Sequence, residues 1–507
     1  MKLDRIYNSK TNIFWGIINR VIDICMPFIV RIGFVRYLGT NYLGLTNLFS
    51  SILQVLALSE LGFGNAVVFS MYGAIARDDN DTLCALLLFY KKVYKIIGLM
   101  MLVFGLIIIP FLPRFINNNS PIDINIYLLY LLYLTNTVIS YVLFGYKTAI
   151  LNAYQRNDLL SKVQSATSIF VGVIQLLALF IFKNIYFYVA ALILGSILYN
   201  LLVQLSTQKY FPNLTCKGVL PISEKKQMWI KIKGLFICKI TGATRNTFDS
   251  IFLSLFLGLD ITGIYSNYFY VLTSVSSIFG IVYISILSGV GNSIETETVE
   301  KNYEDFKNMD FIYMWFSCVC TACLLCLYKP FMVCFFGTGL TFPLSVEIFF
   351  CAYFYAIKMG DIRDVYSSAK GLWYEDKYRY IIESILNIFL NYVLGKYFGI
   401  YGIVGATLFT ILFIGFPTGA FNCFEYYFKN NKLRSYFMFH LFYACVTIII
   451  CMISYLFCKL ITDNSFIFLF VRLFICFVLS NCILFLIFRW FRSYKDARSF
   501  FIRIIRK

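Results

Sequence analysis

Several ionisable side chains interrupt long apolar runs of this sequence. The six that stand out are Arg20, Asp23, Glu60, Lys239, Arg245 and Asp249. An ionisable group inside an apolar helix is costly and usually faces a helix-bundle interior or a wet cavity. Arginine offers a forked set of donors that matches phosphate oxygens. We therefore expect a cationic cavity for an anionic substrate, with the three cations as substrate-binding residues and the three carboxylates as candidates for ion coupling.

A simpler interpretation of the same charges also fits the spacing. Arg20 and Asp23 are three residues apart, and Arg245 and Asp249 are four apart, so each pair could neutralise itself along one helix face. Arg31 lies closer to the end of its apolar run, which favours a side chain that extends toward the membrane interface. Both interpretations of the pairs stay open at this point.

Two further charged positions are less informative. Lys358 and Asp361 are again three residues apart and are expected to pair. Arg472 stands alone in a late apolar run, where we expect helix packing or lipid contact.

Metal and cofactor chemistry is not expected. His440 is the single histidine, and the sixteen cysteines form no pair of CxxC motifs. Cys318, Cys320, Cys323 and Cys326 lie in an apolar run, where cysteine behaves as a small hydrophobic residue.

The composition is that of an all-α integral membrane protein. The chain is 60% apolar and 14% charged, whereas soluble domains are closer to half apolar and a quarter charged. The net charge of +18 comes from cations scattered over short loops, so it indicates membrane orientation and no nucleic acid.

About fourteen apolar runs are long enough to span a bilayer, which takes roughly 20 residues. They lie near 12–35, 43–69, 90–112, 126–146, 163–182, 186–206, 234–257, 264–289, 309–328, 346–360, 379–398, 400–424, 436–458 and 464–489.

The loop charges predict the orientation. With the N-terminus inside, inner segments hold about 32 of the 44 basic residues and outer loops about six. Both termini are then cytoplasmic, and residues 1–11 are too polar for a cleavable signal peptide. We expect a multi-pass protein of the bacterial cytoplasmic (inner) membrane.

A weak internal repeat suggests two similar halves. The run Leu38-Gly39-x-x-Tyr42-Leu43-Gly44 returns as Leu257-Gly258-x-x-Ile261-Thr262-Gly263. Repeated halves are typical of alternating-access transporters. We predict a six-helix bundle at 1–206 and a basic cytoplasmic linker with an interfacial helix at 207–233. A second six-helix bundle follows at 234–424, and two extra helices with a basic tail occupy 425–507.

These motifs resemble one known family. The runs 38–45 (LGTNYLGL) and 58–66 (LSELGFGNA) are similar to the N-terminal motifs of polysaccharide transporters (Wzx-type flippases) of the MOP exporter superfamily. The runs 247–251 and 263–268, and 399–407 (GIYGIVGAT), resemble later motifs of that family. The resemblance covers nearly the whole chain and is weakest after residue 430.

The resemblance implies a MOP/MATE-like fold of two pseudo-symmetric six-helix bundles around a central cavity, plus two C-terminal helices. It implies a flippase, not an enzyme, that moves undecaprenyl-diphosphate-linked oligosaccharide by alternating access. In such relatives, basic residues of the first and seventh helices line the cavity, and Arg20, Lys239 and Arg245 lie in those helices here.

Other functions remain possible on sequence grounds. A drug/cation antiporter or a lipid II flippase shares the fold. A membrane polysaccharide polymerase or ligase is less consistent, because such enzymes carry a large outer loop and the outer loops near 113–125 and 329–345 are short. Expected partners are the lipid-linked oligosaccharide, membrane lipids, a polysaccharide polymerase and chain-length proteins. The polysaccharide itself, whether O-antigen, capsule or exopolysaccharide, is not specified.

Overall fold

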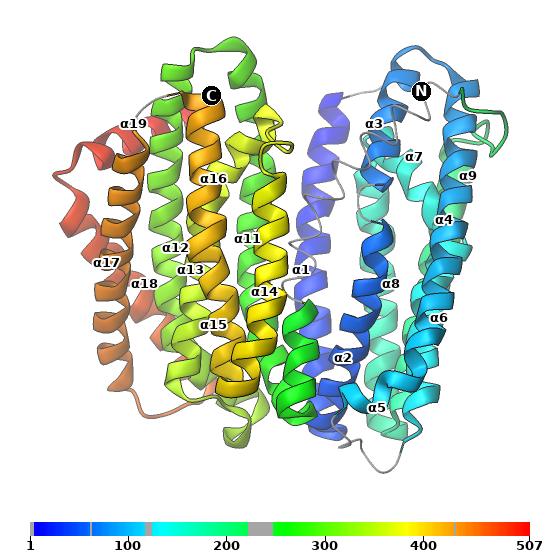
Figure 1. The fold of residues 1–507 in the computed structure, drawn as a ribbon, viewed down its shortest axis with the longest axis horizontal. Coiled ribbons are helices and arrows are strands. Elements are labelled where there is room, and N and C mark those ends of the chain that lie inside the picture. The colour runs from blue at the N-terminus through cyan, green and yellow to red at the C-terminus, as the bar shows by residue number, and fades with distance from the viewer. Residues whose placement is uncertain (1–4, 61–62, 117–123, 222–246, 430–431, 507) are drawn as a thin grey trace. The chain divides into compact units, whose positions relative to one another are not determined.

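The fold is known from a computed structural model (Figure 1). It describes residues 5–60, 63–116, 124–221, 247–429 and 432–506. Every regular element in these residues is helical, which confirms the all-α prediction. The chain divides into two compact units, Met1–Gly263 and Ile264–Lys507.

The first unit is built on pairs of adjacent helices. α1 packs on α8, α8 on α9, α9 on α6 and α6 on α4, and Figure 1 shows α4, α6 and α9 running side by side. Its elements are α1 (Arg5–Tyr37), α2 (Thr40–Leu56), η1 (Ala57–Glu60), α3 (Phe63–Ala76), α4 (Asn80–Ile108), η2 (Ile109–Phe111), α5 (Leu112–Phe115), α6 (Ile126–Val142), η3 (Gly145–Lys147), α7 (Thr148–Ala153), α8 (Asn157–Leu177), η4 (Ala178–Phe182), α9 (Ile185–Tyr210) and the helix Thr247–Leu257.

The second unit is arranged around α12, which packs on α13, α17, α18 and α19. A buried core of aliphatic, aromatic and cysteine side chains joins α12, α17 and α18. The elements are α11 (Leu259–Thr296, whose first turn belongs to the first unit), α12 (Val299–Phe336), η5 (Thr338–Leu340), α13 (Leu344–Lys370), α14 (Lys377–Phe398), α15 (Ile400–Thr410), η6 (Ile411–Gly415), α16 (Phe416–Cys423), η7 (Phe424–Phe428), α17 (Leu433–Lys459), α18 (Phe466–Phe488) and α19 (Arg492–Arg506).

Within the described residues, nine helices are long and apolar enough to cross a membrane, or ten if the bent pair α6 and α7 forms one span. α2 and α3 are separated by a break, the helix Thr247–Leu257 is short, and α13 and α14 carry buried charges. None of these five helices is among the nine that are long and apolar enough to cross a membrane. The total of fourteen spans therefore stays a prediction.

Two glycine turns give the repeated motifs the same local backbone. Gly39 has φ +92° and Gly258 has φ +87°, and each immediately precedes a helix. A side chain is strained in this left-handed region, so glycine is the natural residue at both positions. The sequence repeat therefore corresponds to a repeated helix–turn–helix structure.

The two turns also contact each other through small residues. A Cβ atom on Gly44 would lie 1.9 Å from the Leu259 carbonyl oxygen, and one on Gly263 would lie 2.3 Å from the Thr40 carbonyl oxygen. The Thr40 hydroxyl donates to Asp260 at 2.8 Å. The contact is reciprocal, because each motif presents its final glycine to the residue after the other motif's turn glycine.

Several predicted boundaries change in the structure. The run 43–69 is interrupted after Leu56, and α13 continues to Lys370 where the sequence suggested an end at 360. The predicted basic tail forms α19. Of the predicted linker, 211–221 has no regular helix and 222–233 lies outside the described residues. The predicted division into bundles stays a prediction.

Candidate functional site

Asp23 is the centre of a polar contact between α1 and α8. Its carboxylate accepts hydrogen bonds from Asn19 Nδ2 at 3.0 Å, from Gln164 Nε2 at 3.0 Å and from Ser168 Oγ at 3.2 Å. Ser165 Oγ donates to Asn19 Oδ1 at 2.9 Å and extends the network. Neutral donors from two helices therefore stabilise the Asp23 charge.

Arg20 lies one turn before Asp23 on α1 and is half-buried. Its Nε is buried and has no hydrogen-bond partner among the described residues. No salt bridge joins Arg20 to Asp23 in that part of the chain, where neutral side chains bind the Asp23 carboxylate. A buried donor without an acceptor costs about 1–3 kcal/mol. This site can supply a cation to an anionic group.

A cavity of about 400 Å³ lies beside the same network in the first unit. Residues of α1, α2, α6, α8 and α9 line it, including Arg31, Gln175 and Tyr188. Ser168 both lines the cavity and binds Asp23. Arg31 lines this cavity with a half-buried side chain, and its extension toward the membrane interface stays a prediction.

Glu60 lies where α2 is interrupted. Tyr94 Oη of α4 donates to Glu60 Oε1 at 2.6 Å, and the Tyr141 hydroxyl of α6 donates to the other carboxylate oxygen. The rings of Tyr90 and Tyr94 pack edge to face, with centroids 4.4 Å apart. Phenol donors thus hold a half-buried carboxylate at a helix break. This arrangement is suitable for taking up and releasing a cation.

Asp249 lies on the helix Thr247–Leu257 and is 3% exposed. The same helix contacts α2: Asn47 Nδ2 donates to Ser250 Oγ at 3.0 Å, and Thr247 Oγ1 donates to Gln54 Oε1 at 3.3 Å.

The remaining predicted cations cannot be placed in the same way. Lys239 and Arg245 lie outside the described residues, so their predicted place in a cavity and the predicted pairing of Arg245 stay predictions.

The second unit contains a buried charge cluster that the sequence did not indicate. Asp364 Oδ1 lies 2.8 Å from Arg363 Nη2 and 3.2 Å from Arg379 Nη1. Both arginine side chains are at most 4% exposed, whereas that of Asp364 is 34% exposed. Asp376 lies 3.6 Å from Arg379 and accepts from Asn422 at 2.8 Å. Two buried cations thus share one accessible carboxylate.

Two glycines, Gly415 at the end of η6 and Gly419 in α16, make room for this cluster. A Cβ on Gly419 would lie 1.9 Å from Arg379 Nη1 and 2.8 Å from Arg363 Cζ. A Cβ on Gly415 would lie 2.8 Å from Glu383 Oε2. The two glycines are four residues apart, and so are the charged residues Arg379 and Glu383 of α14. This matched spacing is the sequence signal that could have identified the cluster.

The pairing of Lys358 with Asp361 is confirmed. Lys358 Nζ lies 2.8 Å from Asp361 Oδ2, and Tyr313 Oη donates to the same oxygen at 2.5 Å. Arg472 binds Asn464 Oδ1 at 2.9 Å and the Ile461 carbonyl at 2.6 Å, which fits a packing role. No group of three or more potential metal ligands occurs in the described part of the chain.

Comparison with known proteins identifies both family and fold. The family model described as "Polysaccharide biosynthesis protein" matches residues 9–287. The structure is similar to the lipid II flippase MurJ in an inward closed conformation, with TM-score 0.64, 18% identity, and coverage of 96% of this chain and 99% of that chain. No curated protein matches the sequence.

Multidrug transporters show the same architecture. An inward-facing MATE family transporter of the MOP superfamily has TM-score 0.59 and 12% identity, and the match covers 78% of this chain and 94% of that chain. A MATE transporter of Vibrio cholerae has TM-score 0.54 and 13% identity, with 84% and 98% covered. The expected MOP/MATE-like fold is confirmed. Since the family model spans more than half of the 507 residues, the chain belongs to the polysaccharide biosynthesis protein family, in the membrane-transporter fold of the MOP superfamily.

Proposed function

We propose that this protein is a flippase that moves undecaprenyl-diphosphate-linked oligosaccharide across the bacterial cytoplasmic membrane by alternating access. The observation that carries the proposal is the buried, unpartnered Nε of Arg20 beside the Asp23 network. A diphosphate oxygen would provide the missing acceptor and a compensating charge. The prenyl tail stays in lipid while the head group binds beside Arg20.

The other proposed residues extend this cationic surface. Lys239 and Arg245 are proposed to bind the same head group, because they lie in the predicted seventh span. Basic inner loops support an orientation with both termini in the cytoplasm. The head group then enters from the cytoplasmic side and leaves on the outer side.

A ligand can drive such a cycle only by binding the two states with different affinity. Asp23, Glu60 and Asp249 are proposed as ion-coupling carboxylates. Glu60 is the strongest of the three, because phenol donors from two other helices surround it at a helix break. Protonation would change those hydrogen bonds and so alter how α2 and α3 are joined.

The test is to replace Arg20 and measure surface glycan in a host whose own copy is deleted, together with flipping of a lipid-linked sugar in reconstituted vesicles. Arg20→Ala removes a charge-assisted hydrogen bond, worth about 1.5–3 kcal/mol, so we expect flipping to fall about tenfold or more. Arg20→Lys should retain part of the activity. Arg36→Ala is the matched control, since Arg36 is an exposed arginine of the same helix.

The result against this proposal would be normal flipping by Arg20→Ala. Equal losses in Arg20→Ala and Arg36→Ala would also count against it, because they would indicate a general effect of charge on α1. Size-exclusion profiles of each variant show whether the protein remains folded.

Lipid II flipping is the second candidate, supported by the structural match to MurJ, which covers 96% of this chain. A drug or cation antiporter is the third, and the MATE match that covers 78% of this chain supports it less. Vesicle flipping assays with lipid II and with the oligosaccharide-linked lipid separate the first two, and dye efflux separates the third. A polysaccharide polymerase and chain-length proteins are the proposed partners downstream.

A further inference from the structure

His440, the single histidine of the chain, is buried in the second unit against an acidic side chain. It belongs to α17 and is 6% exposed. Its Nε2 lies 3.1 Å from Oδ2 of Asp310 in α12, and the Asp310 side chain is 11% exposed. Taking two ionisable groups out of water is costly. The pair joins α17 to α12, the helix around which the second unit is arranged.

The charge of the imidazole decides how attractive this contact is. Neither imidazole nitrogen has a hydrogen-bond partner among the described residues, although Nε2 is within ion-pair distance of Asp310. A neutral imidazole therefore gains little from the contact. A protonated imidazole gains the Coulomb attraction of a close carboxylate, which is strong where water is scarce.

Aromatic rings hold the imidazole in this position. The ring of Tyr436 lies 4.2 Å from that of His440, and the ring of Phe416 lies 5.1 Å from it, measured between centroids. The Tyr443 ring lies 5.8 Å away. These rings keep water from the imidazole, so Asp310 is its nearest charged neighbour in the described part of the second unit.

The other titratable or charged groups around the pair do not take over its role. They are Tyr303 of α12, Tyr355 and Arg363 of α13, Cys423 of α16, and Tyr436 and Tyr443 of α17. The Arg363 guanidinium already lies 2.8 Å from Asp364 Oδ1. Phenols and thiols ordinarily stay neutral below about pH 8. Histidine is the side chain that ordinarily changes charge between about pH 5 and 8.

A pocket gives protons a route to the pair. Asp310 lines a pocket of about 580 Å³. The other charged residues of that pocket are Lys301, Glu304, Lys307, Lys432, Arg492, Asp496 and Arg503. Lysine, arginine and carboxylate groups ordinarily keep their charge between about pH 5.5 and 8. They therefore give Asp310 a constant electrostatic background over the range in which imidazole titrates.

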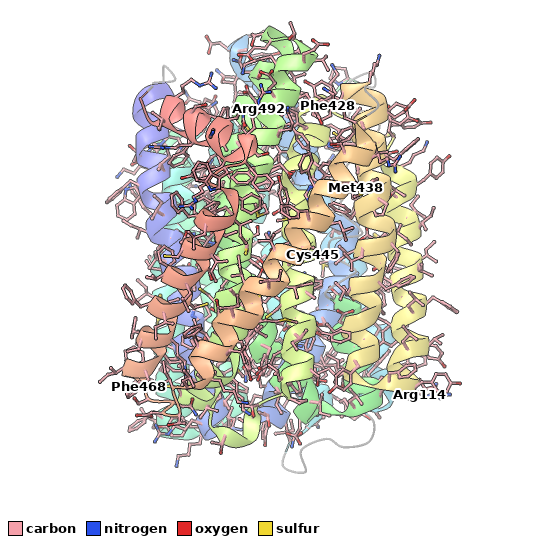
Figure 2. All side chains as sticks on the ribbon, turned by 90° about the vertical axis from the view of Figure 1, so that its left-hand side faces the viewer. Arg114, Phe428, Met438, Cys445, Phe468 and Arg492 are labelled. Atoms are coloured by element: carbon pink, nitrogen blue, oxygen red, sulfur yellow. The ribbon has the colours of Figure 1, made fainter. Side chains whose placement is uncertain are left out.

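The pair lies toward one end of the second unit. Figure 2 shows Met438, two residues before His440, nearer to the end marked by Arg492 and Phe428 than to the end marked by Phe468. With the proposed orientation, this end of α12 and α17 faces the cytoplasm. The pair is therefore placed to respond to the pH of the cytoplasm.

We propose that His440 and Asp310 form a proton-binding latch between α17 and α12. A proton on His440 creates the ion pair and strengthens the attachment of α17. Loss of the proton leaves the Asp310 carboxylate beside a neutral ring and weakens the attachment. The stability that the latch contributes is thus present at low pH and lost as the pH rises. The apolar core shared by α12 and α17 holds the two helices together at any pH.

The first test reads the proton directly. Because the chain has one histidine, untagged full-length protein labelled with nitrogen-15 at histidine gives the NMR signal of this imidazole alone. An opposite charge at this distance changes the ratio of protonated to neutral imidazole by about tenfold or more. We therefore expect the ratio at pH 6.5 to be about tenfold lower in Asp310→Asn than in the wild type. Asp305→Asn is the matched control, because Asp305 is a carboxylate of the same helix that binds Lys301 at 2.9 Å, and it should leave the ratio nearly unchanged.

The second test measures the attachment by thermal unfolding between pH 5.5 and 8. The unfolding temperature of the wild type should fall more over this range than that of His440→Gln, because the variant has no ion pair to lose. Asp310→Asn should flatten the pH dependence in the same way, and the double variant should show no further change.

Three results would overturn the proposal. The wild-type imidazole could stay neutral down to pH 5.5, a result that needs no variant. Asp310→Asn could keep the wild-type ratio, or Asp305→Asn could lower it equally, which would mean a diffuse effect of charge. His440→Gln could retain the full pH dependence of unfolding. Neither test measures flipping, so both outcomes are independent of the proposed function.

Discussion

Replacing Gly44 by alanine tests a close backbone contact of the first unit. The new Cβ would lie 1.9 Å from the Leu259 carbonyl oxygen, well inside normal contact distance. The neighbour is backbone, so a side-chain rotation cannot relieve the overlap. The two turns must move apart, which also weakens the hydrogen bond from Thr40 to Asp260.

The magnitude follows from three contributions. Overpacking a close contact costs about 1–3 kcal/mol. The weakened hydrogen bond adds about 0.5–1.5 kcal/mol. Replacing a helical glycine by alanine also stabilises the folded protein by about 1 kcal/mol, because the unfolded chain has less conformational freedom. We therefore expect Gly44→Ala to destabilise the protein by about 1–3 kcal/mol. Gly263→Ala should behave similarly, since its Cβ would lie 2.3 Å from the Thr40 carbonyl oxygen.

The assay is thermal unfolding of purified protein in detergent, followed by size-exclusion chromatography after heating. Gly280→Ala is the control, because a Cβ at this helical position would have no neighbour within 4 Å and should stabilise α11 slightly. The reasoning is refuted if Gly44→Ala unfolds at the same temperature as Gly280→Ala. A lower unfolding temperature in Gly44→Ala but not in Gly263→Ala would refute the reciprocal contact of the two turns.

Other substitutions give equally specific expectations. Glu60→Gln places an amide donor against a tyrosine hydroxyl, so the transport rate should fall and the protein should lose about 1–3 kcal/mol of stability. Tyr94→Phe should keep a higher transport rate than Glu60→Gln. A lower rate in Tyr94→Phe than in Glu60→Gln would argue against a coupling role for Glu60. Asp361→Asn leaves the buried Lys358 without its charge partner and should cost about 3–5 kcal/mol in thermal unfolding, and an unchanged stability would contradict the pairing. Gly419→Ala should displace the arginine pair of α13 and α14 and cost about 1–3 kcal/mol, which unfolding temperatures can check against Gly280→Ala.

The sequence predicts the apolar helices well, because hydrophobic length is a direct requirement of the bilayer. It predicts less well where charge occurs inside a helix. The sequence interpretation ended the tenth span at 360, before Arg363 and Asp364, yet α13 continues to Lys370. The Arg363 guanidinium donates a hydrogen bond to a group on another element, the Phe416 carbonyl oxygen, at 2.7 Å. Local sequence spacing cannot reveal such a partner.

Partner choice limits the prediction of the candidate site in the same way. The three-residue spacing of Arg20 and Asp23 allows an intrahelical pair, but Asp23 binds donors from α8, about 140 positions later in the sequence. For Lys358 and Asp361 the same spacing does give a pair. Spacing shows that two groups can meet, whereas competing donors from other helices determine whether they do.

The length of α11 and α12 has a mechanical consequence. Each has 38 residues, which corresponds to about 57 Å at 1.5 Å per residue, whereas the bilayer core is about 30 Å thick. Ser293 and Asn302 join the two helices near their connection with a hydrogen bond of 2.9 Å. The hairpin thus forms a stiff arm that extends well past the lipid. A fluorophore attached near Glu297 would amplify small tilts of the membrane-embedded portion and report the transport cycle in real time, without a label on any lipid-facing or substrate-facing residue.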